Sequence, residues 1–211
     1  MVDWDKEITF YKYYVFTLGE IRDLIFSAII LGFLFSSILH YFQYTGFASL
    51  VKNFLISVVI VGPALILHEL AHKIVAQIQG LWAEFRLMMF GALLTLISIF
   101  TPFFKIISPG AVVIAGFSTM EKVGKTALAG PLTNILIAAV LIPFMSFPLP
   151  SYFPLAVVYY GAWINSFMAF FNLIPFGVMD GLKVMLWNKG VWITVFTISI
   201  ALMIYTGLFI F

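Results

Sequence analysis

Residues 54–78 read FLISVVIVGPALILHELAHKIVAQI, an apolar stretch that contains the motif His68-Glu69-Leu70-Ala71-His72. An apolar helix of this length crosses a bilayer of about 30 Å. Residues i and i+4 of a helix share one face, so His68 and His72 are spaced to bind one zinc ion. Glu69 lies within reach of a water molecule on that ion and can accept its proton. Because ionisable side chains at membrane depth are costly and by default functional, the motif predicts a zinc site within the membrane.

The composition indicates that lipid is the solvent for much of the chain. Hydrophobic residues make up 63% of the 211 residues and charged residues 9%, whereas soluble domains average about 25% charged residues. So few charges cannot cover a water-facing surface, and we expect one membrane-embedded domain over 1–211. The formal charge of +2 gives no indication of nucleic-acid binding, and the lack of cysteine excludes thiolate ligands and disulfides.

The distribution of apolar segments predicts an all-α polytopic membrane protein with about five spans. One further apolar segment, 87–104, contains glycine, proline and hydroxyl residues. We interpret it as membrane-associated, either re-entrant or β, and not as a full span; if it crossed, there would be six spans. The first apolar segment is too long for a cleavable signal, so we expect it to be retained. The predicted spans are 24–42, 54–78, 127–147, 153–174 and 191–211.

The basic residues orient these spans. If the N-terminus is cytoplasmic and 87–104 does not cross, Lys52 is the one basic residue outside, and Lys73 lies near the inner end of the second span. That is a positive-inside distribution. A crossing at 87–104 would move the three lysines that follow it outside. We therefore expect a multi-pass protein of a prokaryotic cell membrane with a cytoplasmic N-terminus. The inner basic residues would be Lys6, Lys12, Arg22, Arg86, Lys105, Lys122, Lys125, Lys183 and Lys189.

Two histidines leave a catalytic zinc ion one protein ligand short, because such sites take three. Outside the N-terminal segment and the motif, the carboxylates are Glu84, Glu121 and Asp180. Glu121 ends the pattern Ser118-Thr119-Met120-Glu121, a capping box, and can pair with Lys125 four residues later. Glu84 is interpreted as an interfacial charge near aromatic and basic neighbours.

Asp180 has no such alternative partner in the sequence. It lies in the stretch 172–181, where a proline and two glycines break the helix after the fourth span. In the predicted topology the second and fourth spans both run inward, so His72 and Asp180 reach the same half of the membrane. These relations favour Asp180 as the third ligand. The alternative is an aspartate that caps the next short helix.

Three elements in this order resemble the site-2 protease family of intramembrane zinc metalloproteases. The first is the HExxH motif, the second opens the predicted third span, and the third follows the fourth span. Together they cover about 54–190, whereas residues 1–50 show no motif of that family. The elements are His68-Glu69-Leu70-Ala71-His72, Ala129-Gly130-Pro131-Leu132-Thr133-Asn134, and Asn172-Leu173-Ile174-Pro175 through Asp180-Gly181.

The resemblance implies a specific chemistry. It implies one zinc ion per chain held by His68, His72 and Asp180, with Glu69 as general base for peptide-bond hydrolysis in transmembrane protein substrates. It implies that Asn172 and Asn134 contact the substrate or the developing oxyanion, although Asn134 could instead bond to a neighbouring helix. It also implies a substrate-pairing strand, here residues 110–116, whose alternative is a buried loop segment.

Other interpretations of the same residues stay open at this stage. A catalytically inactive membrane protein of the same fold would keep the ligands without the reaction. A small membrane transporter would use buried polar groups as an ion path, but this does not explain a glutamate between two histidines at ligand spacing. The sequence does not identify the substrate, the cleavage site or the oligomeric state.

Overall fold

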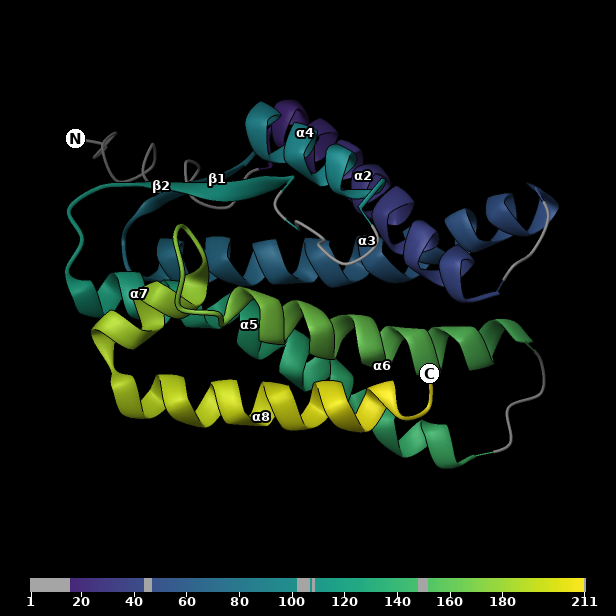
Figure 1. Ribbon diagram of the computed structural model, residues 1–211. Coiled ribbons are helices and arrows are strands. Elements are labelled where there is room, and N and C mark those ends of the chain that lie inside the picture. Colours follow the sequence, from purple (N-terminus) through teal and green to yellow (C-terminus); the bar gives the residue numbers. More distant parts are fainter. Residues whose placement is uncertain (1–15, 44–46, 102–106, 108, 148–151, 211) are drawn as a thin grey trace, which may run out of the picture.

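The structure is a computed structural model that describes residues 16–43, 47–101, 107, 109–147 and 152–210. It is mostly helical, with one small two-stranded sheet (Figure 1). The predicted cytoplasmic placement of the N-terminus concerns residues that lie outside the described ones. The elements are α2 (Leu18–Gln43), α3 (Phe47–Ile78), β1 (Trp82–Leu87), α4 (Met89–Ser98), β2 (Gly110–Ala115), α5 (Met120–Leu141), η1 (Ile142–Ser146), α6 (Tyr152–Asn172), α7 (Asp180–Trp187) and α8 (Lys189–Gly207).

Three helical stretches of the described residues are long and apolar enough to cross a membrane: Val51–Ile78 in α3, Met120–Ser146 in α5 and η1, and Lys189–Gly207 in α8. They correspond to the predicted second, third and fifth spans. The predicted spans 24–42 and 153–174 form the helices α2 and α6. That α2 and α6 also cross stays a prediction.

The region between α3 and α5 combines strands with a short helix. The helix α4 has 10 residues, and a helix of about 15 Å is too short to cross about 30 Å of hydrocarbon. Within its described part, 87–101, the segment therefore does not form a full span on its own; residues 102–104 lie outside the described residues. The predicted strand is confirmed as β2, which pairs antiparallel with β1 in the register Phe85↔Val112. Glycine at position 116, with φ of 128°, ends this strand.

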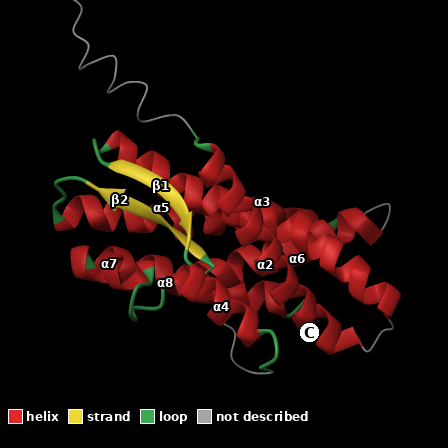
Figure 2. Ribbon diagram, turned by 90° about the horizontal axis from the view of Figure 1, so that it is seen from above, coloured by secondary structure: helices red, strands yellow, loops and turns green. Residues whose placement is uncertain are grey.

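The helices pack around a core shared by α2, α3 and α6. The helices α2 and α3 run antiparallel, since Gly32 faces Val58 and Gly62 faces Ala28. A Cβ atom at Gly32 would overlap the Val58 side chain, so glycine permits this close approach. Figures 1 and 2 place the sheet over the end of the helix layer at which α3 ends and α5 begins. The buried core includes Leu31, Leu34, Phe35, Ile56, Ile60, Val61, Ile164 and Met168.

The helix that contains the third predicted span begins before that span, close to the predicted capping box. The helix α5 begins at Met120 and not near 127, and its N-cap is Thr119, whose side chain accepts a hydrogen bond from the Lys122 N–H. Ser118 therefore does not cap the helix. Pro131 lies inside α5 and not at its opening. The helix is longer than the predicted span because its first turns are rich in charged and small residues, which are compatible with a helix but are not apolar.

Candidate metal and catalytic site

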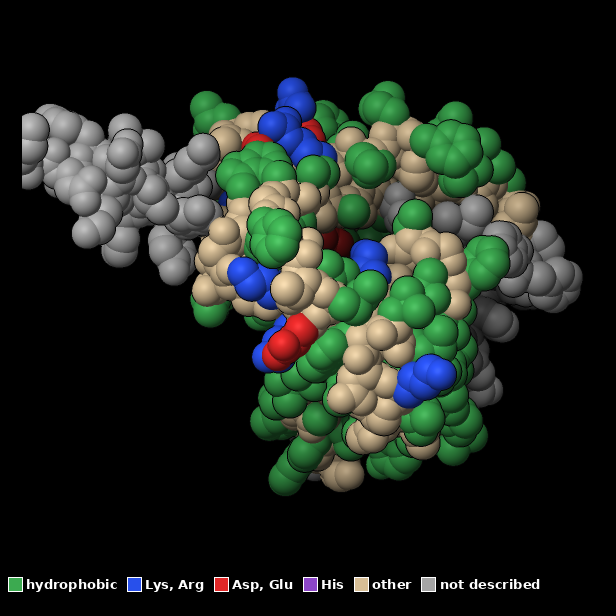
Figure 3. Space-filling model, turned by 90° about the vertical axis from the view of Figure 1, so that its left-hand side faces the viewer, with side chains coloured by type: hydrophobic (Ala, Val, Ile, Leu, Met, Phe, Trp, Pro, Cys, Tyr) green, Lys and Arg blue, Asp and Glu red, His purple; other side chains and the backbone are tan. Residues whose placement is uncertain are grey.

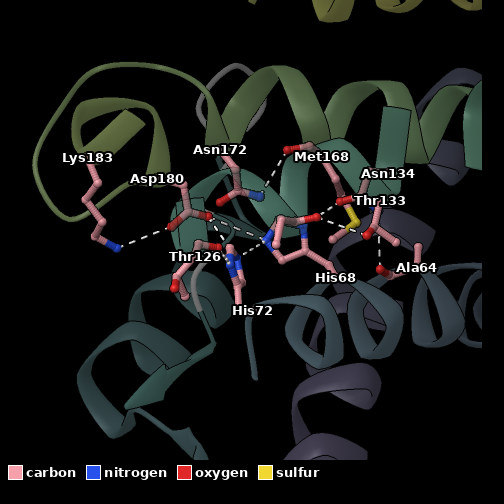
Figure 4. A network of polar contacts seen from close by, with 11 residues as sticks. Ala64, His68, His72, Thr126, Thr133, Asn134, Met168, Asn172, Asp180 and Lys183 are labelled. Atoms are coloured by element: carbon pink, nitrogen blue, oxygen red, sulfur yellow. Dashed lines mark hydrogen bonds and ion pairs between the residues drawn. The ribbon is translucent and has the colours of Figure 1, made fainter. Parts of the chain in front are cut away.

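Side chains from two distant parts of the chain converge at one point. His68 and His72 lie on one face of α3, and Asp180 is the first residue of α7. Asp180 Oδ2 lies 3.0 Å from His72 Nε2 and 3.6 Å from His68 Nε2, and the two Nε2 atoms are 3.0 Å apart. Ligand atoms at the corners of a zinc tetrahedron are separated by about 3.3 Å, given bonds of about 2.0–2.1 Å. The three atoms thus form a set that fits one zinc ion with an open fourth position (Figure 4).

The opposite ring nitrogens of both histidines have fixed partners. His68 Nδ1 lies 2.5 Å from Asn134 Oδ1, and His72 Nδ1 lies 2.7 Å from the carbonyl oxygen of Thr126. Both partners are acceptors, so each Nδ1 donates and each Nε2 keeps its lone pair for a metal ion. Outer hydrogen bonds of this kind orient metal-binding histidines. The helix α5 therefore sets the tautomer of both imidazoles.

The backbone after α6 brings Asp180 to the histidines. The chain turns at Gly177, which has φ of 60°, and a Cβ atom at Gly181 would overlap the Leu173 carbonyl group. Asp180 does not cap α7, because the N-cap residue is Met179 and no side chain makes a cap hydrogen bond there.

The two oxygens of Asp180 have different neighbours. Lys183 Nζ donates to Oδ1 across 3.2 Å, which leaves Oδ2 facing the imidazoles. Burial of Asp180 by itself raises the pKa of its carboxyl group, but the neighbouring His72 outweighs burial and holds that pKa below its ordinary value. The carboxylate is therefore ionised, as a metal ligand must be.

A glycine in α5 makes room for the imidazoles. A Cβ atom at Gly130 would overlap Nε2 of both His68 and His72. Glycine is needed here for a close approach between a helix backbone and side chains.

Glu69 lies beside these atoms and also touches the sheet. Its side chain is buried, and the backbone N–H of Val112 in β2 faces its carboxylate. A candidate base, a set of metal ligands and a strand thus lie together. On the end face of the molecule, a recess among hydrophobic side chains holds an acidic side chain beside a basic one (Figure 3).

The structure brings some of the predicted residues to this cluster and not others. Asn172 lies near Asp180 and His68, and its amide donates to the Met168 carbonyl oxygen across 3.0 Å (Figure 4). Glu84 is buried away from the cluster, where it accepts from Thr17 and pairs with Arg86. Glu121 forms the expected ion pair with Lys125 at 2.6 Å.

The side chain of Asn134 is hydrogen-bonded to other residues of the protein. Its amide donates to the Ala64 carbonyl oxygen across 3.3 Å and to Asn165 Oδ1 across 2.8 Å, while its oxygen faces His68. Both amide protons are thus used, and the side chain is fully buried. This geometry fits a residue that orients His68 and not one that contacts substrate or oxyanion.

Three neighbours of the site had not been identified from the sequence: Thr126, Asn165 and Lys183. Asn165 had a detectable signal, since a polar side chain within an apolar span needs a partner. Thr126 acts through its backbone carbonyl group, which leaves no trace in the side-chain pattern.

Comparison with known proteins gives one extensive similarity. A protein of Methanocaldococcus jannaschii, named "Putative zinc metalloprotease", is 39% identical over 191 residues, which cover 90% of this chain and 95% of that protein. The match therefore extends over most of this chain and most of that protein. No model of a protein family matches the chain, and no solved structure matches it.

Proposed function

This chain belongs to the metalloprotease family of the Methanocaldococcus jannaschii protein, and we propose that it is an intramembrane zinc endopeptidase of the site-2 protease type. Its substrates would be transmembrane proteins, cut within or next to their membrane segments. The observation that carries this proposal is the meeting of three ligand atoms, from His68, His72 and Asp180, beside a buried Glu69 in an apolar helix.

The residues of the site divide the reaction between them. His68, His72 and Asp180 would hold one zinc ion, which supplies Lewis acidity to a water molecule and to the scissile carbonyl group. Glu69 accepts the proton of the attacking water and passes it to the leaving amine. Asn172, at the edge of the cluster, is the candidate contact for the substrate or the developing oxyanion.

A helical substrate must unwind before hydrolysis, and its freed backbone groups then need partners in lipid. The strand β2 offers such partners. The Phe85 and Leu87 N–H groups of β1 point to α2 and away from β2. In an antiparallel pair, two residues directly opposite each other both point their N–H groups either toward or away from the neighbouring strand, and this direction alternates along each strand. The N–H groups of Val112 and Ile114 therefore lie on the outer edge of β2, where Val112 meets Glu69. A strand added at this edge would run past the proposed base.

The topology forms part of the proposal. We place the protein in a prokaryotic cell membrane with its N-terminus in the cytoplasm. The positive-inside distribution and the short length of α4 support this orientation. In this topology the C-terminal ends of α3 and α6 lie on the same side of the membrane. This agrees with the contact between His72 and Asp180.

Purified protein with a transmembrane substrate tests the function. The parent is expected to bind one zinc ion and to cleave. Glu69→Gln should retain zinc and lose nearly all cleavage, because an amide cannot accept the proton, whereas Asp180→Ala should lose zinc. Glu121→Gln, which removes an exposed carboxylate, is the matched control and should change neither quantity. Full cleavage by Glu69→Gln would overturn the mechanism.

A further inference from the structure

A carboxylate of α2 is buried between the metal-binding helix and the sheet, although α2 carries no motif. Glu20 is fully buried. Its Oε2 lies 2.6 Å from Lys73 Nζ in α3, and its Oε1 accepts from the Phe85 N–H of β1 across 3.0 Å. One side chain thus bonds to two other elements at once.

Both partners of Glu20 are adjacent to the proposed catalytic machinery. Lys73 directly follows His72, and its ammonium group lies 4.0 Å from the centre of the Phe16 ring. Phe85 is the register partner of Val112, whose N–H meets Glu69. Glu20 of α2 is therefore connected to the proposed base through two strand residues, Phe85 and its cross-strand neighbour Val112.

A second carboxylate closes the same edge of the sheet. Asp23, three residues after Glu20 and on the same face of α2, accepts from the Leu87 N–H across 3.1 Å. Of the three outward N–H groups of β1, those of Phe85 and Leu87 are thereby taken by α2, so a strand added at this edge would have to displace both carboxylates. Strand addition is therefore favoured at the edge of β2. A small pocket between α2, α3 and β1 borders Glu20, Lys73 and Glu69 together.

The buried ion pair between Glu20 and Lys73 is not explained by its contribution to fold stability alone. A buried ion pair loses its hydration, and apolar residues of similar volume often stabilise a protein as well or better. The buried pair is therefore weak evidence for added stability, and a role in fixing the position of the sheet is the alternative. We propose that Glu20 is a positioning residue: it holds the sheet against α3 so that the outer edge of β2 lies in register with Glu69. This inference rests on the proposed hydrolysis.

Two double variants separate positioning from stability. Glu20→Gln with Lys73→Gln removes both charges but keeps an oxygen for the Phe85 N–H. Glu20→Leu with Lys73→Leu removes both charges and that acceptor as well. Each variant is compared with the parent for bound zinc, for Tm in detergent, and for kcat and KM on a transmembrane substrate.

The Gln pair is expected to keep kcat within about threefold of the parent. The Leu pair should keep zinc and Tm but lose about tenfold or more in kcat with little change in KM, because the substrate strand still pairs but lies displaced from the reacting atoms. Equal kcat values for the Gln and Leu pairs, at equal zinc content and Tm, would overturn the proposal.

A failure of the proposed function would be recognised separately. A parent that cleaves no transmembrane substrate would refute proteolysis itself. Hydrogen–deuterium exchange of the backbone amides of 82–87 and 110–115 then tests whether Glu20 positions the sheet, independently of any cleavage. Faster exchange in the Leu pair than in the Gln pair supports it, and equal exchange refutes it.

Discussion

Asn134 Oδ1 lies 2.5 Å from Nδ1 of His68 and fixes which nitrogen of that ring faces Asp180. Asn134 is in turn held by Asn165 Oδ1 at 2.8 Å and by the Ala64 carbonyl oxygen. Three helices therefore contribute to the orientation of one imidazole.

Replacement of Asn134 by leucine should weaken zinc binding by about 10–100-fold, the usual cost of losing an outer partner of a metal-bound histidine. Zinc affinity measured by competition with a chelator provides the test. Thr133→Ala is the control, because Thr133 bonds to the Ala129 carbonyl oxygen of its own helix. Equal zinc affinities for Asn134→Leu and the parent would show that His68 keeps its orientation without Asn134.

Replacement of Gly130 by alanine should abolish zinc binding while the protein stays folded in detergent. The added methyl group would occupy the space of both Nε2 atoms, and neither backbone can move away without unpacking α3 from α5. Metal content after purification is the measurement. Gly62→Ala is a matched control in α3, since its Cβ atom would meet Ala28 at an ordinary 3.6 Å. A fully loaded Gly130→Ala protein would contradict the predicted close approach.

Ile114→Pro should slow cleavage of a transmembrane substrate while zinc stays bound. Proline removes the outward N–H that an added strand would use, and one net backbone hydrogen bond corresponds to about fivefold in rate. Ile114→Ala controls for the loss of the side chain and should cut at nearly the parental rate. If the proline variant cuts as fast as the alanine variant, substrate does not pair with this edge of β2.

Single cysteines can report the topology directly, because the natural chain contains none. Cysteines at Lys12 and Ser118 should be labelled from the same side of the membrane, and a cysteine at Ala48 from the opposite side. Labelling with an impermeant maleimide in oriented vesicles distinguishes the sides. Labelling of positions 12 and 118 from opposite sides would mean that the region between α3 and α5 crosses.

The proposed zinc motif was predictable because its geometry is local. The helical period alone places His68 and His72 on one face, so no knowledge of packing is needed. The strand 110–116 was predicted from the resemblance to the site-2 protease family, and its β-branched residues are compatible with extended backbone. Asp180 could not be predicted from local geometry. It was selected by eliminating Glu84 and Glu121 and by assuming a topology, and the structure places it at the histidines.

The sequence by itself thus determined the membrane environment, the helical spacing of two histidines and the identity of the candidate base. Tertiary structure alone decided that Thr126 and Asn134 orient the imidazoles, that Gly130 makes room for them, and that Glu20 joins α2 to both α3 and β1. The physical reason is that periodicity reports which face a side chain shares with its own helix. The partner of a buried polar group depends on which helices pack together, and neither a backbone carbonyl group nor an absent Cβ atom has a sequence pattern of its own.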